Sequence, residues 1–483
     1  MSQNTTEGLP RWTIAMIILC GAVSCYFALN SGFMDDDFTQ LWNTRHPLWQ
    51  SLYHALAAPD MFSDMYYRPL TRVIHRLLFA TLDASAIAHH GFSILVHLLN
   101  SVLVWRLGRR MGAPENVARI AAIVFAIHPV HVEPVTSISA LGGLLAGTFV
   151  FLSLIAYLRY LKGDPGRWGS VAVMTSVLGL LCKEDVISLP LSLGVVWWLY
   201  ARDRRHTWWP AAAMIPVIAV WLVWRVAIGG TLAAQDAHFS LNPLTVFRNL
   251  PFHVTRMLVS VRSLFRVTDF DWYYRVRDAL PPLPNSPVYV AVVLLIVAAL
   301  AYVVWRRWSG WPRYIRAGFL LCVSTLALYL PLRESATRFL YIPVAGLAIA
   351  VVGLLLNKSR VRRAILVVWM LVLSVSLVEQ TSTWYGARAE VEKVLAQAVD
   401  IRQAYPPDVG TVFADYPRRY YAATVFASSL PEAICWTTQY DWPYLYGYRD
   451  VPFETKTVVP DSVVWFRWQD NRFELYTPAD SLR

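Results

Sequence analysis

The sequence predicts an all-α polytopic membrane protein that ends in a small α/β module. Of the 483 residues, 56% are hydrophobic and only 16% are charged, whereas soluble domains carry about 25% charged residues. Apolar segments long enough to cross a bilayer recur along the chain, and the composition turns polar after about residue 381. These three observations favour a helical membrane domain followed by a separate water-exposed module.

We expect about eleven transmembrane helices, because about twenty mostly apolar residues span 30 Å of hydrocarbon. Arg11 precedes the first apolar run, which lacks a small-residue cleavage site and is therefore interpreted as an uncleaved span. The predicted helices cover residues 12–30, 89–107, 115–131, 137–160, 168–182, 185–201, 208–228, 287–305, 314–332, 338–356 and 364–380.

The loops between these helices alternate in charge. Lysines and arginines fill every second loop, after about residues 107, 160, 201, 305 and 356. The positive-inside rule places these loops in the cytoplasm, so the N-terminus is expected inside and the C-terminus outside. The net charge of +11 is thus a topology signal and indicates no nucleic-acid partner. The pattern points to an integral protein of a bacterial inner membrane, with a periplasmic C-terminus.

The chain divides into two predicted domains. Residues 1–385 form the transmembrane domain, with long outer loops at about 31–88 and 229–286, and residues 386–483 form the extracytoplasmic α/β module. Residues 388–403 have the pattern of an amphipathic helix. Residues 462–476 predict a hairpin with Asp470-Asn471 in its turn.

The first outer loop contains a candidate interfacial helix. Arg68, Arg72 and Arg76 recur at every fourth position and form a basic stripe. This spacing is typical of a helix lying in the membrane interface. We expect its apolar face to consist of Leu70, Val73, Ile74 and Leu77.

Charged and polar groups collect at helix ends on the predicted outer face. A charge at bilayer depth costs about 2.5–3.5 kcal/mol, so Asp35-Asp36-Asp37 marks the end of the first span. His128–Glu133 and Lys183-Glu184-Asp185 follow later spans. A transporter would more often place charge at mid-membrane on broken helices. The arrangement favours a catalytic chamber, and a transporter or flippase of lipid-linked glycans is the alternative.

Four segments carry a family resemblance, in this order: Tyr67–Thr71 (YRPLT) leading to Phe92–Asn100 (FSILVHLLN), His128–Glu133 (HPVHVE), Leu181–Glu184 (LCKE) and Arg338–Pro343 (RFLYIP). Together they resemble the transmembrane O-mannosyltransferases that carry tetratricopeptide repeats. The chain lacks those repeats and has the C-terminal module in their place.

The resemblance implies the C-type fold of membrane glycosyltransferases. It also implies a polyprenyl-phosphate sugar donor, transfer on the outer membrane face, and an acidic residue of the first outer loop that assists catalysis. Asp36-Asp37-Phe38 with Leu41 fits the family's register, and Asp35-Asp36 is the alternative. The missing repeats leave the sugar and the acceptor open, whether protein, lipid or glycan.

An inverting displacement needs a carboxylate that takes the acceptor's proton, and cations that stabilise the departing phosphate. Asp36 is the first choice for the base and Asp37 the second, while Asp35 is expected to be a solvated helix end. Lys183, Arg333 and Arg338 are candidates for the phosphate. The alternatives are snorkelling for the two arginines and a simple ion pair with Glu184 for Lys183.

The remaining candidates are expected to orient the substrates: His131, Glu133, Glu184, Tyr67 and Arg68. His128 and His131 could instead bind a divalent metal together with Asp36, although Pro129 breaks the helical spacing. The resemblance implies metal-independent catalysis, so we expect no required cofactor and keep a divalent metal as the alternative.

Overall fold

A computed structural model covers the whole chain. It describes residues 28–258, 306–332, 336–356, 359–447 and 463–476, apart from gaps at 45–46, 59–65, 202–206, 230–241 and several positions between 415 and 444, and a few single residues elsewhere. The predicted spans 12–30 and 287–305 and much of the loop 229–286 therefore lie outside the described residues.

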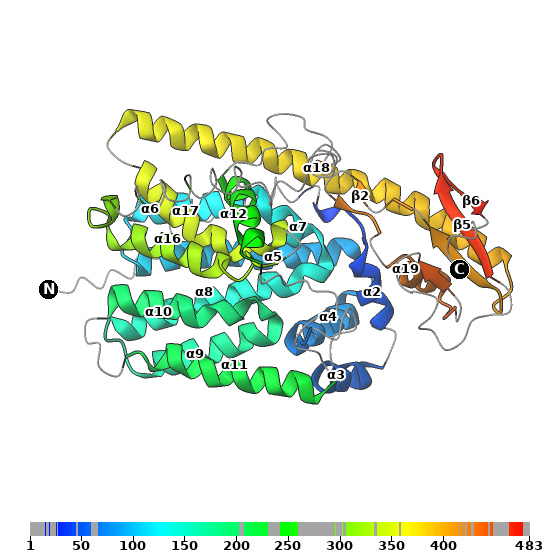
Figure 1. Cartoon of the computed structure of the whole chain (residues 1–483), viewed down its shortest axis with the longest axis horizontal. Coiled ribbons are helices and arrows are strands. Elements are labelled where there is room, and N and C mark those ends of the chain that lie inside the picture. Colours follow the sequence, from blue (N-terminus) through cyan, green and yellow to red (C-terminus); the bar gives the residue numbers. More distant parts are fainter. Residues whose placement is uncertain are drawn as a thin grey trace.

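Long helices packed side by side form the body of the molecule, as Figure 1 shows. The bundle consists of α5 (Ala86–Arg110), α6 (Glu115–Ala126), α8 (Leu141–Leu161), α9 (Arg167–Cys182), α10 (Leu189–Tyr200), α11 (Trp209–Ala227), α16 (Arg313–Leu326), α17 (Tyr341–Leu355) and the first part of α18 (Arg360–Ala404). A further helix, α12 (Pro243–Leu258), crosses the bundle steeply.

Glycines set the closest helix crossing of the bundle, between α16 and α17. A Cβ on Gly318 would lie 2.7 Å from the carbonyl oxygen of Gly346, and one on Gly346 would lie 2.5 Å from that of Gly318. Small residues of this kind allow transmembrane backbones to approach closely.

The described part of the chain contains five helices long and apolar enough to cross a membrane. A sixth span results if α6 is joined to the segment Pro129–Thr136, which is bent from it by 48°. The predicted continuous helix 115–131 is thus wrong beyond residue 126, because Pro129 begins a new turn, η1 (Pro129–His131), followed by α7 (Val132–Thr136). The chain is an integral membrane protein, and the number of eleven spans stays a prediction.

Three short helices cap one end of the bundle: α2 (Asp36–Asn43), α3 (Leu48–Ala57) and α4 (Pro69–Leu82). The predicted apolar face of α4 is confirmed in part, since Leu70 and Ile74 pack against the core of the bundle. The buried positions of α4 include Thr71, His75 and Phe79, whereas Leu77 is 45% exposed. These three positions are four residues apart, so they form one helical stripe that faces the bundle.

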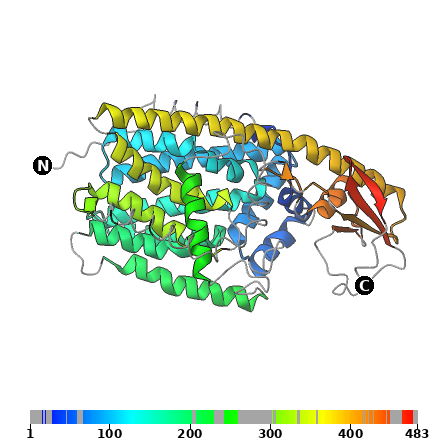
Figure 2. The same cartoon turned by 45° about the horizontal axis from the view of Figure 1, so that its top comes forward.

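The helix α18 runs along the whole bundle and continues past its end (Figure 2). It joins the predicted span 364–380 to the predicted amphipathic helix 388–403 without a break, and it passes through the predicted domain boundary at 385. Val391, Val394 and Ala398 are buried, so its second half has the amphipathic pattern that the sequence indicated.

The C-terminal residues form a four-stranded sheet, in the order β4-β1-β5-β6, and the helix α19 (Leu430–Thr438). The strand β1 (Gly410–Ala414) is parallel to both β4 (Leu445–Gly447) and β5 (Val463–Gln469). Two short strands, β2 (Arg419–Tyr420) and β3 (Ala423–Thr424), pair separately. The predicted hairpin is confirmed: β5 pairs antiparallel with β6 (Arg472–Tyr476), and Asp470 and Asn471 have φ of 47° and 65° in its turn.

Two apolar cores stabilise these parts. One lies within the helix bundle, and the other joins the first outer loop to the C-terminal residues. In the second core, Phe38 and Leu41 of α2 share a cluster with Phe426, Leu430 and Ile434. The loop that carries the three aspartates therefore folds against the module.

Candidate active site

Asp35 lies at the start of α2 and is tied to the C-terminal residues. Its N–H donates to the carbonyl oxygen of Val425 at 3.2 Å, and its carboxylate accepts from the Ser429 hydroxyl at 3.0 Å. It has a positive φ of 42°, which Asp adopts more readily than most residues. The expectation that Asp35 is a solvated helix end is therefore wrong.

Asp37 is fully buried, and two backbone N–H groups hold its carboxylate. One carboxylate oxygen accepts from the N–H of Met34 at 3.2 Å, and the other accepts from the N–H of Ser139 at 2.8 Å. Burial raises the pKa of Asp37 to about 7, against the lowering effect of these two bonds. Asp37 thus fastens the loop to η2 (Ile138–Ala140).

Asp36, in the first turn of α2, is only partly buried. Burial, together with the neighbouring Asp35, raises the pKa of Asp36 to about 7. Arg338 and Arg68 lower the pKa of Asp36, whereas the Glu432 carboxylate raises it. A carboxyl group that titrates near neutral pH is suited to accept a proton in catalysis.

The Lys183-Glu184 turn is placed by a packing contact between α4 and α9. The Thr71 hydroxyl donates to the carbonyl oxygen of Cys182 at 2.8 Å. A Cβ on Gly142 would lie 3.0 Å from that hydroxyl oxygen and 3.1 Å from that carbonyl, so the glycine makes room for the bond. The chain then turns into η3 (Glu184–Ser188).

This turn sends adjacent carboxylates in different directions. Lys183 pairs with Asp185 at 2.8 Å, so the expected alternative of a pair between Lys183 and Glu184 is wrong. The Glu184 carboxylate instead accepts hydrogen bonds from both Nε and Nη2 of Arg68, the one from Nε at 2.8 Å. Burial opposes ionisation of Glu184, yet the Arg68 guanidinium outweighs burial and lowers the pKa of this carboxyl to about 2.

Glu133 connects α7 to η5 (Thr337–Leu340). Its Oε2 accepts from the Thr337 hydroxyl and from the N–H of Arg338, the latter at 3.0 Å. Its Oε1 lies 3.3 Å from the Arg338 guanidinium. The Arg338 side chain stays 45% exposed, whereas that of Lys183 is 10% exposed.

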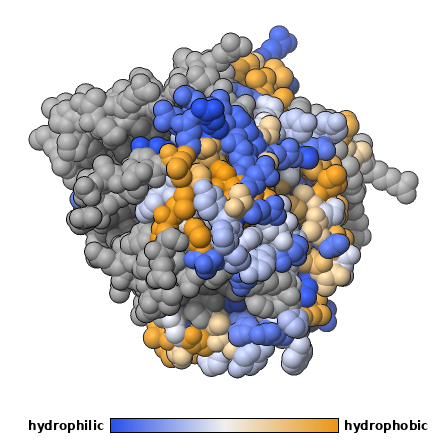
Figure 3. Space-filling model, turned by 90° about the vertical axis from the view of Figure 1, so that its right-hand side faces the viewer, coloured by the Kyte–Doolittle hydropathy of each residue, from blue (hydrophilic) through white to orange (hydrophobic). Residues whose placement is uncertain are grey.

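Asp36, Arg68 and Arg338 therefore act on one another at one end of the bundle, which we call the site end. Tyr66 belongs to the same group, since the Arg68 guanidinium lies 4.0 Å from its ring centroid. Arg68, Glu184, Arg338 and Asp36 all affect its ionisation. Figure 3 shows the molecule from the module side, where the described surface mixes hydrophilic and apolar patches.

Two predicted site residues lie elsewhere. The Tyr67 hydroxyl donates to the carbonyl oxygen of Leu56 at 3.0 Å and accepts from Trp224 Nε1 at 3.1 Å, which fastens α3 and α11 together. His131 is buried in the bundle, where Nδ1 donates to the carbonyl oxygen of Phe125 at 2.7 Å. Both residues stabilise the fold at the positions that the structure gives them.

The metal alternative finds no matching geometry. His128 is fully buried and its Nε2 donates to the carbonyl oxygen of Met257 at 2.8 Å. Within the part of the chain that the structure describes, no three His, Cys, Asp or Glu side chains form a metal-sized group, so Asp36, His128 and His131 do not converge. Arg333 lies outside the described residues. The independence of catalysis from cofactors stays a prediction.

No family model matches the chain. It is 26% identical over 185 residues to protein O-mannosyl-transferase TMTC3 of Mus musculus, a match that covers 36% of this chain and 20% of the relative. It is 32% identical over 139 residues to protein O-mannosyl-transferase Tmtc2 of Drosophila melanogaster, covering 27% and 14%. The resemblance to these O-mannosyltransferases is confirmed. The matched part of the chain spans a fifth or less of the length of both relatives.

Two solved structures are also similar to the chain. One is the archaeal oligosaccharyltransferase AglB from Archaeoglobus fulgidus in complex with an inhibitory peptide and a dolichol-phosphate, with a TM-score of 0.47, 13% identity, and coverage of 90% of this chain and 64% of that one. The other is the arabinofuranosyltransferase AftD from Mycobacteria, with a TM-score of 0.44, 16% identity, and coverage of 87% and 31%.

Several residues of the O-mannosyltransferase-like segments act inside the bundle. His97 Nδ1 lies 3.0 Å from the Tyr341 hydroxyl, which also accepts from Asn100 Nδ2 at 3.0 Å. Asn100 donates in addition to the carbonyl oxygen of Leu144 at 2.9 Å and accepts from Thr148 at 2.7 Å. This network joins α5, α8 and α17, so these residues hold the helices of the bundle together in this chain.

Sequence reasoning missed Glu432, which acts on Asp36 from the first turn of α19. Its only signal was an acidic residue after Leu430-Pro431 at a helix start, which says nothing about a partner almost four hundred residues away. It also missed the role of Phe339, whose ring lies 5.9 Å from Lys183 Nζ and 5.8 Å from the Arg338 guanidinium.

Proposed function

We propose that the protein is a glycosyltransferase that moves a sugar from a polyprenyl-phosphate donor to an acceptor on the outer face of the membrane. The observation that carries this proposal is the position of Asp36 at one end of an apolar bundle. Its carboxyl group has a pKa of about 7 and interacts electrostatically with Arg338 and Arg68. The partial similarity to protein O-mannosyl-transferases supports the same class of reaction.

In the proposed reaction, the Asp36 carboxylate takes the proton of the acceptor's hydroxyl group. The acceptor oxygen then bonds to the anomeric carbon of the sugar, and the bond between that carbon and the phosphate oxygen breaks with inversion. The electron pair leaves with polyprenyl phosphate, whose added negative charge needs cations at the site.

Arg338 is the strongest candidate for this phosphate. It is the most exposed of the three paired cations, and its 3.3 Å contact with Glu133 is longer than the contacts of Lys183 and Arg68 with their carboxylates. Guanidinium groups also match phosphate oxygens geometrically. Arg68 is fixed by two bonds to Glu184, so we propose that it orients the site and adds charge at longer range.

The test uses the purified full chain in nanodiscs, supplied with a panel of polyprenyl-phosphate hexoses and pentoses and with peptide, lipid and glycan acceptors. Release of polyprenyl phosphate is measured for the native protein and for Asp36→Asn. We expect the substitution to lower turnover by about 10²- to 10⁴-fold, the usual contribution of a general base.

Asp83→Asn is the matched control, because Asp83 precedes α5 in the same loop and its φ of 53° suits Asn. It should leave turnover unchanged. Near-normal turnover of Asp36→Asn would refute the assigned base. If no donor is consumed with any acceptor, the enzyme proposal fails and the transporter alternative takes its place.

A further inference from the structure

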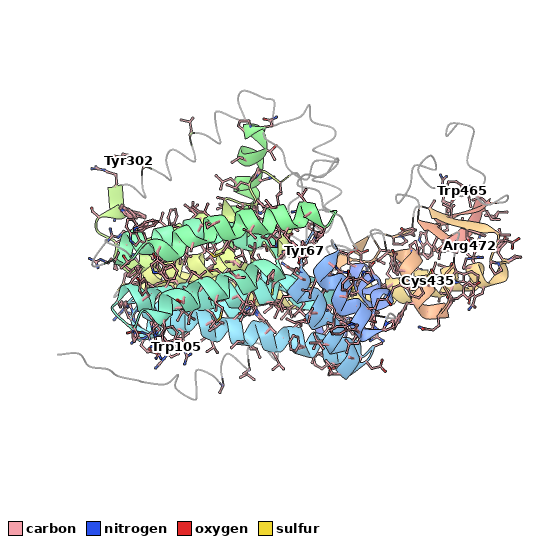
Figure 4. All side chains as sticks on the ribbon, turned by 90° about the horizontal axis from the view of Figure 1, so that it is seen from below. Tyr67, Trp105, Tyr302, Cys435, Trp465 and Arg472 are labelled. Carbon is pink, nitrogen blue, oxygen red and sulfur yellow. The ribbon has the colours of Figure 1, made fainter. Side chains whose placement is uncertain are left out.

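A cavity lies at the opposite end of the bundle from Asp36. Its volume is about 790 Å³, and it opens between the start of α16, the end of α17 and the start of α18. Trp105 and Tyr302, labelled in Figure 4, lie at this end of the molecule, while Tyr67 lies toward the other. We call it the arginine cavity, after Arg307, Arg362 and Arg363 in its lining.

The charge of the arginine cavity has one sign. The residues that line it include the three arginines and no Asp or Glu. The nearest acid along the chain, Glu115, precedes the lining residue Asn116 but pairs with Arg109 and Arg119, each at 2.7 Å. Positive charges gathered in a cavity without a carboxylate favour an anionic occupant.

The lining of the cavity is apolar where it meets the helices. Trp311, Ile315 and Leu354 contribute to its wall. The Tyr314 ring fits beside α17 because position 353 is glycine, where a Cβ would lie 2.7 Å from the ring. An occupant with both a charged and an apolar part matches this wall better than a free inorganic anion does.

The apolar surface continues outside the cavity along α18. Val361, next to Arg362, is 69% exposed, and Ile365 and Val368 are 51% and 59% exposed. These side chains belong to a helix that is apolar enough to cross the membrane. The arginines therefore stand where an outward-facing apolar surface, suited to acyl chains, reaches the end of the bundle.

We infer that the arginine cavity binds the phosphate headgroup of an anionic glycerophospholipid. The headgroup phosphate lies among Arg307, Arg362 and Arg363, and the acyl chains lie along the exposed face of α18. Basic pockets between transmembrane helices bind anionic lipid headgroups in this manner. The inference does not depend on the proposed transferase reaction.

The experiment measures lipid retention by native mass spectrometry of the full chain released from nanodiscs. The nanodiscs contain equal amounts of phosphatidylglycerol and phosphatidylcholine with identical acyl chains. We expect phosphatidylglycerol to be retained preferentially. A variant with Arg307, Arg362 and Arg363 all changed to Gln should lose that preference, by about fivefold for each arginine removed.

The control changes Arg167, Arg313 and Arg360 to Gln. These exposed arginines lie at the same end but do not line the cavity, so the preference should survive. Added inorganic phosphate at millimolar concentration should not displace the lipid; displacement would assign the site to a free anion and overturn the proposal. Equal retention of both lipids by the native protein would also overturn it, whether or not the triple variant folds.

Discussion

The site end of the bundle and the arginine cavity at the other end surround their arginines differently. At the site end, Arg68 and Arg338 each contact a carboxylate, as does Lys183. At the other end, Arg307, Arg362 and Arg363 line a cavity that has no carboxylate in its wall. The surroundings of these two sets of cations therefore differ.

The difference teaches what each set of charges can do. A cation held by a carboxylate has a defined position, which catalysis needs, since reacting groups must be placed before the reaction. A cavity whose lining holds arginines and no carboxylate favours a ligand of opposite charge. The site end therefore suits chemistry on a bound substrate, and the arginine cavity suits retention of an anion.

The largest expected effect is on Arg338. Arg338→Gln should lower kcat by about 10²- to 10³-fold, the scale of losing one group that stabilises developing charge. It should also move the acid limb of the pH–rate profile to higher pH, because Arg338 lowers the pKa of Asp36. Arg313→Gln, at the end of the bundle that holds the arginine cavity, should change neither kcat nor the pH profile. An equal loss of kcat in that variant would show that the two ends do not differ in function.

Glu184→Gln should destabilise the fold. The substitution leaves the Arg68 guanidinium without its charged partner, and both side chains are only about a fifth exposed (19% and 23%). Breaking a buried pair costs about 3–5 kcal/mol, so we expect about 2–3 kcal/mol here, measured as the free energy of unfolding in detergent. The exposed pair of Arg472 and Glu474 offers the control, as Glu474→Gln should cost less than about 0.5 kcal/mol.

Asp35→Asn should shift the pH dependence without removing activity. The Asp35 carboxylate raises the pKa of Asp36, so its loss lowers that pKa. Asp36 must be ionised to accept a proton, and the acid limb of kcat/KM should therefore move to lower pH. Asn keeps an acceptor for Ser429 and tolerates the positive φ. A shift in the opposite direction would exclude Asp36 as the titrating base.

The smallest effect is expected at the arginine cavity. Arg307→Gln should change the free energy of unfolding by less than about 0.5 kcal/mol when no anionic lipid is present, because no carboxylate of the lining loses a partner. The same unfolding measurement used for Glu184→Gln applies. A loss as large as that of Glu184→Gln would show that Arg307 itself stabilises the fold through a charged partner.

The sequence predicted the helices well because hydrophobic length is a local property. Predicted spans such as 89–107, 168–182 and 208–228 differ by at most three residues at each end from α5, α9 and α11. It failed where tertiary contacts decide, as on α4, where Thr71 is buried because Cys182 offers a carbonyl acceptor. The continuity of α18 through residue 385 was also missed, since its apolar pattern changes there while its backbone does not.

The sequence predicted which charged residues lie at the site, but not which of them pair with one another. Loop topology placed Asp36, Arg68, Glu184 and Arg338 on one face, and the structure brings these four together. The partner of each charge could not be predicted, because Arg68 and Glu184 are separated by 116 residues and Lys183 turns to Asp185 instead of its immediate neighbour. The partners of His131 and Tyr67, the carbonyl oxygens of Phe125 and Leu56, could not be predicted either.

Because α18 is continuous, it connects the helix bundle rigidly to the C-terminal module. Its 45 residues extend over roughly 67 Å, more than twice the thickness of the hydrocarbon layer. Each residue advances the helix by about 100°, so the number of residues in α18 sets the angle at which Val425 and Ser429 meet Asp35. The geometry at Asp36 is thus specified partly by a count of residues, a constraint that substitutions within the helix leave intact and that a single insertion would violate.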